Sequence, residues 1–407
     1  MQKGTIETME TRAGDPGAFA RFDLNRVDSP AFVVDAARLR ANLAVLAEVR
    51  DRAGIKVLAA LKAFSMWKVA PIVGEYLDGV CTSGLWEARL AGEFYQGEIA
   101  TYCAGYKAED MAEICAISDH IIFNSPGQLA RLRPQLEAAR AAGAVFDIGL
   151  RINPLHAEGE VPRYDPCAAH SRLGFPVDQL TEADLEGVDG LHFHTLCEQD
   201  FAPLARTWEA LRPRVAAFLP GLKWLNFGGG HHITRADYQR GELIDFLIRV
   251  KAETGCELYL EPGEAVALDA GILVGTVLDS HWNGMPVAIT DISATCHMPD
   301  VIEAPYRPAM LGELPVEEEI VDEGQGGAVR LGGPSCLAGD VIGDYRLPIP
   351  CEPGARFAFL DQAHYSMVKT TTFNGVPLPS IWLWDSATDS LQKVREFGWE
   401  EFRNRLS

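Results

Sequence analysis

The feature that most constrains the fold is a succession of eight short, apolar, strand-like runs, each followed by a helical pattern. The runs are Val57–Phe64, Leu77–Ser83, Ile99–Gly105, His120–Asn124, Phe146–Asn153, Gly190–Thr195, Lys223–Phe227 and Cys256–Glu261. The amphipathic stretches between them, with apolar residues three and four apart, include Leu85–Gln96, Gly127–Ala142, Phe201–Phe218 and Arg235–Glu253. Such alternation indicates parallel βα units. An open doubly wound sheet could use the same units, but eight in uninterrupted succession favour a closed (β/α)8 TIM barrel, which buries every strand edge.

The pattern changes after about residue 275. Strand-like runs separated by Gly and Pro rather than by helices follow at Val287–Ile292, Ala328–Leu331, Arg356–Leu360 and Ser380–Trp384. A length of 407 residues also exceeds what one hydrophobic core usually holds. We therefore expect an N-terminal extension (1–28) that can supply a strand to the second domain, a barrel (29–275) and a C-terminal all-β domain (276–407). A helix over Asp35–Ala53 is predicted to cover the open end of the barrel.

Composition narrows the possible functions. A formal net charge of −21 would repel the phosphates of nucleic acids and anionic membranes, and it is compatible with a cationic substrate. The longest apolar runs, such as Val57–Leu61, fall far short of the roughly 20 residues of a membrane span, and no basic segment followed by an apolar one opens the sequence. Nine cysteines, an odd number without a C-x-x-C pair, suit a reducing compartment. We expect a cytoplasmic protein that binds neither nucleic acid nor membrane.

Lys62 lies near the carboxyl end of the first predicted strand, between apolar Leu61 and Ala63. Strand alternation would point it into the barrel, and chemistry in such barrels lies where the strands end. A sheltered lysine has a lowered pKa and is the usual nucleophile for binding an aldehyde. The alternative is a lysine that extends to the rim and keeps its ammonium group in water.

Two further strand ends carry candidate residues. The seventh strand ends in Asn226-Phe-Gly-Gly-Gly-His231, where three glycines would let backbone N–H groups approach an anion. Phosphate sites in barrels commonly use the loops after strands seven and eight. Glu261-Pro-Gly263 closes the eighth strand, and a carboxylate there could hold a pyridine nitrogen protonated. The alternatives are a tight turn for the glycines and a structural ion pair for Glu261.

His192 and His194 end the sixth strand and lie on one face of it, because side chains alternate along a strand. With His231 and His232 they permit a metal site, and hence a metal-dependent barrel hydrolase. The sequence lacks an H-E-x-x-H motif and a cysteine partner for such a site, so we predict no metal. In the preferred interpretation His194 stacks on a planar cofactor and His192 is a polar core residue one layer below.

The second domain contributes one loop of interest, Gly333-Pro-Ser-Cys-Leu-Ala-Gly-Asp340. Gly and Pro fix a tight loop that exposes a thiol. A loop without function is the usual explanation. The thiol of Cys336 gains interest only if another surface brings it to the mouth of the barrel.

Taken in order, these motifs resemble the fold-type III, alanine-racemase-like decarboxylases that use pyridoxal 5'-phosphate, over about Ser29 to Trp384. Ala60-Leu-Lys-Ala63 resembles the segment whose lysine, here Lys62, carries the cofactor as a Schiff base. Phe193-His194 resembles the histidine stacked on the pyridine ring. The resemblance further implies the remaining cofactor contacts: Gly228, Gly229 and Gly230 with the phosphate, Glu261 with the ring nitrogen, and Tyr365 with the phosphate.

The same resemblance implies a homodimer. Gly333-Pro-Ser-Cys336 is similar to the segment that a partner subunit inserts into the active site. Ornithine and diaminopimelate decarboxylases of this family read E-P-G-R and carry an acid after the inserted cysteine. This chain has Glu264 and Leu337 at those positions, which departs from both enzymes.

Four segments resemble more narrowly the carboxynorspermidine/carboxyspermidine decarboxylases. They are Leu61-Lys-Ala-Phe-Ser-Met-Trp67, His194-Thr-Leu-Cys-Glu198, Glu261-Pro-Gly-Glu264 and Cys296-His-Met-Pro-Asp-Val-Ile-Glu303. The resemblance implies decarboxylation of carboxynorspermidine or carboxyspermidine to norspermidine or spermidine, a step of polyamine biosynthesis. These two substrates differ by one methylene, worth about 1–3 kcal/mol in a pocket, and the sequence does not choose between them.

The implied mechanism needs few side chains. Glu261 and His194 maintain the electron sink of the cofactor, and Cys336 or Lys62 protonates Cα, with the resemblance favouring Cys336. Asp300 and Glu303 are the candidates for binding the distal ammonium groups of the substrate. The rival hypotheses are a diaminopimelate, ornithine or arginine decarboxylase and a non-catalytic protein that binds pyridoxal phosphate.

Overall fold

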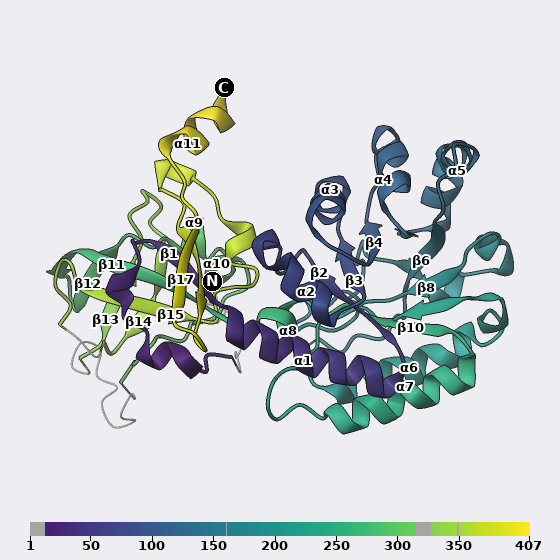
Figure 1. Cartoon of the computed structure of the whole chain (residues 1–407), viewed down its shortest axis with the longest axis horizontal. Coiled ribbons are helices and arrows are strands. Elements are labelled where there is room, and N and C mark those ends of the chain that lie inside the picture. Colours follow the sequence, from purple (N-terminus) through teal and green to yellow (C-terminus); the bar gives the residue numbers. More distant parts are fainter. Residues whose placement is uncertain (1–12, 160, 315–326, 348–349) are drawn as a thin grey trace, which may run out of the picture. The chain divides into compact units, whose positions relative to one another are not determined.

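The computed structural model describes residues 13–159, 161–314, 327–347 and 350–407 and divides into two compact units (Figure 1). Unit 2 runs from Arg40 to Val266, and unit 1 comprises the described residues up to Leu39 together with those from Ala267 to Ser407. Within the described residues no helix is both long and apolar enough to cross a membrane.

Unit 2 is a closed barrel of parallel strands. The strands are β2 (Lys56–Ala60), β3 (Gly79–Thr82), β4 (Glu98–Cys103), β5 (His120–Phe123), β6 (Asp147–Asn153), β8 (Gly190–His192), β9 (Trp224–Asn226) and β10 (Glu257–Leu260). Each pairs in parallel with the next, β5 pairs with β6, and β10 returns to β2, while the short β7 (Phe175–Pro176) adds to β6. All eight strands expected from the sequence are present in the expected order, so the barrel prediction is confirmed.

Helices follow the barrel strands, and Figure 1 shows α3, α4 and α5 outside the strands and α6 and α7 side by side. In α6 the buried residues recur at helical spacing, including Leu204, Trp208, Leu211 and Val215, which gives the helix one apolar face for packing. The helices are α1 (Ala36–Ala53), α2 (Ala70–Tyr76), α3 (Leu85–Phe94), α4 (Met111–Ile117), α5 (Pro126–Ala141), α6 (Phe201–Val215), α7 (Arg240–Thr254) and α8 (Glu264–Ala267). Short 3-10 helices in this unit are η3 (Trp67–Val69), η4 (Ala108–Asp110), η5 (Val177–Gln179), η6 (Glu182–Leu185) and η7 (Leu219–Gly221).

One large side chain explains two glycines in the strands. Trp224 is buried with Leu58, Ala100, Ile122 and Tyr259 in one apolar cluster. A Cβ added at Gly190 would lie 2.0 Å from the Trp224 ring, and one added at Gly149 would lie 2.5 Å from it. The indole therefore takes the space that side chains of β6 and β8 would fill, because a closed barrel interior has no spare volume.

A polar cluster lies where several barrel strands begin. Glu98 of β4 accepts hydrogen bonds from Lys56 Nζ (2.9 Å) at Oε1 and from Tyr259 Oη (2.9 Å) at Oε2, and His120 Nε2 lies 3.4 Å from Oε2. The hydrogen bond with His120 is the largest cause that lowers the pKa of Glu98 to about 2, against the opposing effect of burial. The ionised carboxylate therefore ties β2, β4, β5 and β10 together.

We expect replacement of Glu98 by glutamine to lower the free energy of unfolding at pH 7 by on the order of 2 kcal/mol. Because the folded-state pKa is depressed below the ordinary value of 4.5, this stabilisation is present above about pH 4.5 and is lost as the pH falls towards 2. Denaturant unfolding of both proteins should give a constant difference from pH 6 to 8 and a narrowing one below 4.5. The control is Glu113→Gln, which breaks an exposed ion pair with Arg89 and should change stability little. A difference that widens on acidification would contradict this assignment.

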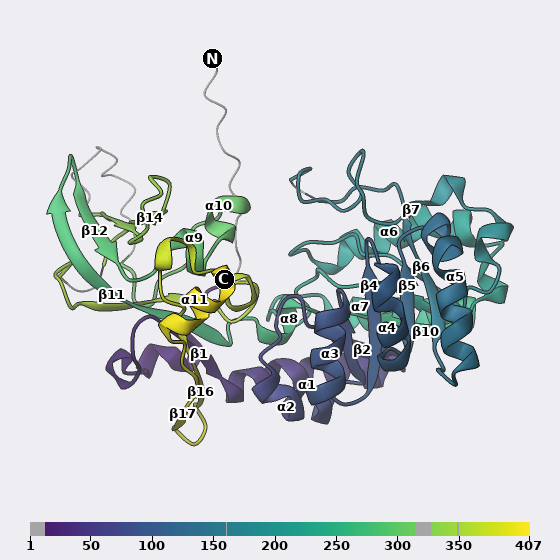
Figure 2. The same ribbon diagram turned by 90° about the horizontal axis from the view of Figure 1, so that it is seen from above.

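Unit 1 is a mixed sheet domain. Its strands are β1 (Ala31–Asp35), β11 (Gly271–Trp282), β12 (Pro286–Thr290), β13 (Val329–Gly332), β14 (Val341–Tyr345), β15 (Arg356–Leu360), β16 (Ser380–Asp385) and β17 (Ser390–Arg395). The order is β14-β13-β12-β11-β1-β16-β17, with β15 pairing to β11, and Figure 2 shows the long antiparallel pair β11–β12. Its helices are α9 (Ala294–His297), α10 (Asp300–Glu303), α11 (Trp399–Leu406), η1 (Gly17–Arg21), η2 (Leu24–Arg26), η8 (Met367–Lys369) and η9 (Phe373–Gly375).

The structure corrects the expected domain limits. We expected the barrel to span 29–275, but β1 and the start of β11 pair with each other antiparallel, Ala31 opposite Val274, in the sheet of unit 1. The limits therefore shift to Arg40 and Val266. The sequence also did not reveal four strands of this sheet, β1, β11, β14 and β17. Of the expected extension, residues 1–12 lie outside the described residues, and the rest adds no strand before β1 but packs Phe19 and Phe22 against Trp384.

Candidate active site

Lys62 lies in the turn that directly follows β2. Hydrogen bonds pin this turn on both sides, from Leu61 N–H to the carbonyl of Cys81 (3.0 Å) and from Ala60 N–H to that of Pro262 (2.9 Å). The Lys62 side chain is exposed, so the expectation that burial shelters it is wrong for the chain by itself. The reason is its position past the last residue of the strand, in the open mouth of the barrel. Its positive charge nevertheless acts on Glu261, where it helps to lower the pKa of the carboxyl group.

Glu261 follows β10 and its carboxylate is held at both oxygens. One oxygen accepts from Asn226 Nδ2 (2.7 Å) and the other lies 3.1 Å from His192 Nε2. Burial favours the neutral acid, but His192, Asn226 and Lys62 outweigh it and lower the pKa of Glu261. The structure thus provides a fixed, ionised carboxylate at the carboxyl end of the barrel strands.

The E-P-G sequence has a packing explanation. A Cβ at Gly263 would lie 2.9 Å from Cβ of Ala63, which is too close for any larger residue to fit without a shift of the Lys62 turn. The turn that carries Glu261 and the turn that carries Lys62 therefore abut. Both candidate residues therefore lie at the same end of the barrel, just beyond the neighbouring strands β2 and β10.

His194 lies two residues beyond β8 and is oriented by the backbone. Its Nδ1 accepts from Gly229 N–H (2.9 Å), so the neutral ring carries its proton on Nε2. Burial, followed by the charge of Lys62, lowers the pKa of His194 well below its usual value. His192 lies below it as a buried polar residue whose Nε2 contacts Glu261. A flat, neutral imidazole at this place is suited to stacking on an aromatic cofactor.

The three glycines after β9 are required by close approach. A Cβ at Gly228 would lie 2.8 Å from the His194 ring, one at Gly229 would lie 2.0 Å from the carbonyl oxygen of Glu261, and one at Gly230 would lie 1.9 Å from that of Leu196. Gly228 and Gly230 also have φ of 66° and 87°, which favours glycine. A ligand that approaches this turn therefore contacts the backbone of the three glycines, because they carry no side chains.

The structure limits how many of these N–H groups can hold an anion. Gly228 N–H donates to Asn226 Oδ1 (2.8 Å) and Gly229 N–H donates to His194. Of the three N–H groups, only that of Gly230 has no acceptor among the hydrogen bonds of the described residues. The turn therefore fits a phosphate by its shape and one N–H group, and not by the three donors that we expected.

Sequence reasoning missed two side chains of this site. Asn226 is opposite His192 in the β8–β9 register, and both contact Glu261. Arg151 of β6 is buried, donates to the carbonyl oxygen of His194 (3.1 Å) and lies over the Tyr102 ring at 4.6 Å. A single arginine between apolar Leu150 and Ile152 in a predicted strand was the signal that could have found it.

A second group of charged residues surrounds the end of the glycine turn. His232 Nε2 lies 2.6 Å from Glu264 Oε2, and ligand atoms of Glu198, His232 and Glu264 all lie within 4.8 Å of one another. Glu264 places a carboxylate directly after the E-P-G segment, so this position offers no cation to an anionic group. The absence of a metal stays a prediction.

The four histidines considered for a hydrolase do not form one set. His192 contacts Glu261, His194 the glycine turn, His231 the hydroxyl of Tyr238 (2.6 Å) and His232 Glu264. In the described part of the chain, the one group of at least three residues that could hold a metal contains His232 alone of these. The geometry therefore gives no support to a four-histidine centre.

Unit 1 carries the remaining candidates. Cys336 is exposed in the loop between β13 and β14. Glu303 is exposed, and Asp300 is ion-paired with Lys369 (2.6 Å), a contact that the sequence did not predict. Lys369 Nζ also lies 5.0 Å from the centre of the Tyr365 ring.

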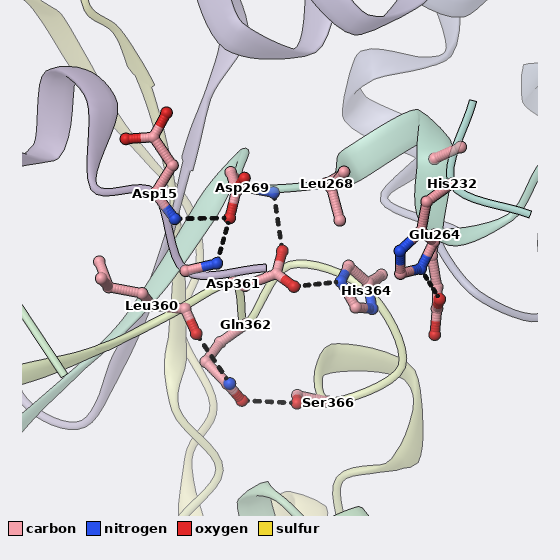
Figure 3. Close-up of polar contacts among 12 residues, drawn as sticks. Asp15, His232, Glu264, Leu268, Asp269, Leu360, Asp361, Gln362, His364 and Ser366 are labelled. Carbon is pink, nitrogen blue, oxygen red and sulfur yellow. Dashed lines mark hydrogen bonds and ion pairs between the residues drawn. The ribbon is translucent and has the colours of Figure 1, made fainter. Parts of the chain in front are cut away.

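The loop that presents Tyr365 is fixed by side chains (Figure 3). Asp361 accepts from Asp269 N–H (2.7 Å) and lies 3.0 Å from His364 Nε2, while Gln362 accepts from Ser366 Oγ (2.7 Å). Asp361 and Tyr365 both have positive φ, 56° and 46°, which costs of order 1 kcal/mol or more each. These contacts hold the loop in that unfavourable conformation.

Four features of this site match the groups that bind pyridoxal phosphate. They are a lysine at the mouth of the barrel, a neutral histidine, a fixed carboxylate and a glycine turn. The fold and the residues at this end of the barrel thus fit a barrel enzyme that uses this cofactor.

The family of the chain follows from its similarity to known proteins. A family model described as "Pyridoxal-dependent decarboxylase, C-terminal sheet domain" matches residues 31–363. The chain belongs to the pyridoxal-dependent decarboxylase family, and it is a carboxy-lyase that uses pyridoxal phosphate.

Two relatives are equally similar in sequence. The chain is 38% identical over 385 residues to a carboxynorspermidine/carboxyspermidine decarboxylase of Campylobacter jejuni, covering 93% of this chain and 99% of the relative. It is also 38% identical over 390 residues to a carboxyaminopropylagmatine decarboxylase of Synechocystis sp., covering 94% and 96%.

A solved structure resembles the chain over nearly its whole length. It is carboxynorspermidine decarboxylase of Campylobacter jejuni complexed with norspermidine, with a TM-score of 0.84 and 38% identity over 93% of this chain and 100% of that one. Diaminopimelate decarboxylase of Helicobacter pylori, at 16% identity and a TM-score of 0.77, shares the fold.

Proposed function

We propose that this enzyme decarboxylates carboxynorspermidine and carboxyspermidine to norspermidine and spermidine, as a step of polyamine biosynthesis. The observation that carries the proposal is the near-full-length similarity to the Campylobacter jejuni enzyme, whose structure holds norspermidine. A net charge of −21 suits a polycationic substrate. Glu264 and Leu337, which depart from ornithine and diaminopimelate decarboxylases, support the same choice.

Pyridoxal phosphate, when bound, supplies the electron sink that receives the electron pair of the Cα–carboxylate bond as carbon dioxide leaves. Lys62 would hold the cofactor through its side-chain amine in the resting enzyme. Glu261, kept ionised by His192 and Asn226, holds a proton at the ring nitrogen. His194 supports the ring face, and the thiol of Cys336 delivers a proton to Cα.

The phosphate contacts follow from the glycine turn. Gly228 and Gly229 give the phosphate room by lacking side chains, and Gly230 offers its N–H. Tyr365 adds a hydroxyl group to the same phosphate. The exposed position of Cys336 supports its insertion into the active site of a partner subunit in a homodimer. All nine cysteines lack disulfide partners, which supports a cytoplasmic location.

A second candidate substrate is carboxyaminopropylagmatine, because the Synechocystis relative is 38% identical over a similar length. Its agmatine end carries a planar guanidinium group in place of an ammonium group. A carboxylate can bind guanidinium through two parallel hydrogen bonds, so Asp300 and Glu303 suit either end group.

The test is release of carbon dioxide from each carboxylated polyamine by purified holoenzyme, which should absorb at about 420 nm. We expect kcat/KM for carboxynorspermidine and carboxyspermidine to exceed that for ornithine, arginine and diaminopimelate by about 100-fold or more. A higher kcat/KM for carboxyaminopropylagmatine would favour the second candidate. A holoenzyme spectrum without turnover of any substrate would favour a non-catalytic protein.

Replacing Asp300 with asparagine is expected to raise KM for the carboxylated polyamine by about tenfold, the loss of one charge-assisted contact. Since this contact binds the substrate without touching the reacting atoms, kcat should change little. Steady-state kinetics with Asp279→Asn, an exposed aspartate of β11, as the control variant measures this effect. An unchanged KM would remove Asp300 from the substrate site.

A further inference from the structure

Asp340 is a buried carboxylate that joins two segments of unit 1. The residue is only 4% exposed. Oδ2 accepts from Ser293 Oγ (2.8 Å) and from Ser335 N–H (3.3 Å), and Oδ1 accepts from Thr295 N–H (3.2 Å). The carboxylate therefore bonds at once to the loop that carries Cys336 and to the start of α9.

The loop is folded closely around this residue. Gly333 N–H donates to the Asp340 carbonyl (2.9 Å) and Asp340 N–H donates to the Leu337 carbonyl (2.9 Å), which closes the loop. A Cβ at Gly333 would lie 2.3 Å from a carboxylate oxygen, so the glycine makes room for the Asp340 side chain. The exposed Cys336 lies inside the segment that these bonds close.

The other contact fixes α9 and the chain that continues from it. Ser293 Oγ, which donates to Asp340, also caps α9 by accepting from Cys296 N–H (3.1 Å). The helix α10, which begins with Asp300, comes directly after α9. The Cys296 carbonyl accepts from Thr371 N–H (2.9 Å), two residues beyond Lys369. One buried carboxylate thus connects the loop of the thiol with a rigid part of the fold.

We propose that Asp340 is a positioning residue that fixes the Cys336 loop against α9, so that the thiol is aligned for proton delivery to Cα. The inference rests on the proposed role of Cys336. Asp340 itself does not touch the substrate. Its effect on the reaction passes entirely through the thiol, and this separates it from a merely structural residue.

Asparagine at this position removes a necessary acceptor while it keeps the shape of the side chain. The carboxylate accepts backbone N–H groups on both oxygens, from Ser335 and from Thr295. An amide has one oxygen, so whichever way it is turned, one of these N–H groups faces a donor. Both contacts are partly buried, and a partly buried N–H group that loses its acceptor destabilises the conformation of the segment that carries it.

The experiment is a double-mutant cycle on kcat with holoenzyme and carboxynorspermidine. We expect Cys336→Ala to lower kcat by roughly 100-fold and Asp340→Asn to lower it by on the order of tenfold. In the Cys336→Ala background, Asp340→Asn should have no further effect, because the group that it aligns is absent. The matched control is Asp344→Asn on β14, which breaks an exposed ion pair with Arg330 of β13 and should leave kcat unchanged.

The outcomes separate the two claims. If Asp340→Asn lowers kcat by the same factor with and without Cys336, the positioning role is wrong while the proton-donor role stands. If Cys336→Ala retains full kcat, the proton-donor role fails and the positioning role fails with it. Should Asp340→Asn not fold, Ser293→Ala removes one donor to the carboxylate and should show a smaller loss of kcat, again absent in the Cys336→Ala background.

Discussion

Replacing Lys62 with alanine is expected to lower kcat for decarboxylation by roughly four orders of magnitude or more. The reason is that Lys62 is the proposed anchor of the cofactor, and no other lysine follows a barrel strand so directly in the described residues. Steady-state release of carbon dioxide from carboxynorspermidine measures the effect. The absorbance at about 420 nm should disappear together with the activity.

The matched control is Lys68→Ala. Lys68 is also an exposed lysine and lies six positions further on, in η3. Because it lies outside the turn that Cys81 and Pro262 hold, its loss should leave both the spectrum and kcat unchanged. Substantial turnover by the Lys62→Ala protein would contradict the assignment of this lysine.

Replacing Glu261 with glutamine is expected to lower kcat by roughly 100- to 1000-fold, the range for loss of one preorganised electrostatic contact. The carboxylate keeps its charge in a buried place because His192, Asn226 and Lys62 lower its pKa. Glutamine fills the same volume but cannot stabilise a proton on a pyridine nitrogen. Since the effect is on the reacting ring and not on substrate binding, KM should change little.

The control for this variant lies on the same strand. Glu257 begins β10 and pairs with Lys251 (2.8 Å) away from the barrel mouth, so Glu257→Gln should retain full kcat. Kinetics of both variants from pH 6 to 8 should give the same ratio throughout, because a lowered pKa keeps Glu261 ionised over this range. A Glu261→Gln enzyme with wild-type kcat would remove Glu261 from the mechanism.

The sequence predicted the barrel because its signal is local. Each strand and the helix after it are adjacent along the chain, so the change of period between them is visible in one short window. The partners of β1 are distant: β11 and β16 begin with Gly271 and Ser380. The run Ala31–Asp35 is buried throughout and therefore shows no alternation that could assign it to the other sheet. The barrel limits were consequently set too wide at both ends.

The same distinction applies to the site. Lys62, His194 and Glu261 could be named as candidates from the sequence because each follows the end of a recognisable strand. The contacts of Asn226 and His192 with Glu261 could not, since they depend on how three neighbouring strands are aligned. The pairing of Asp300 with Lys369 joins residues far apart in the sequence, and no spacing rule reveals it.

The most direct test of the central claim is borohydride reduction of the holoenzyme followed by peptide mass mapping. Reduction converts the link between a lysine and the aldehyde carbon of the cofactor into a stable bond. We predict that the added mass lies on the peptide that contains Lys62 and on no other lysine peptide. Modification of a different lysine, or none at all, would contradict the account of this site.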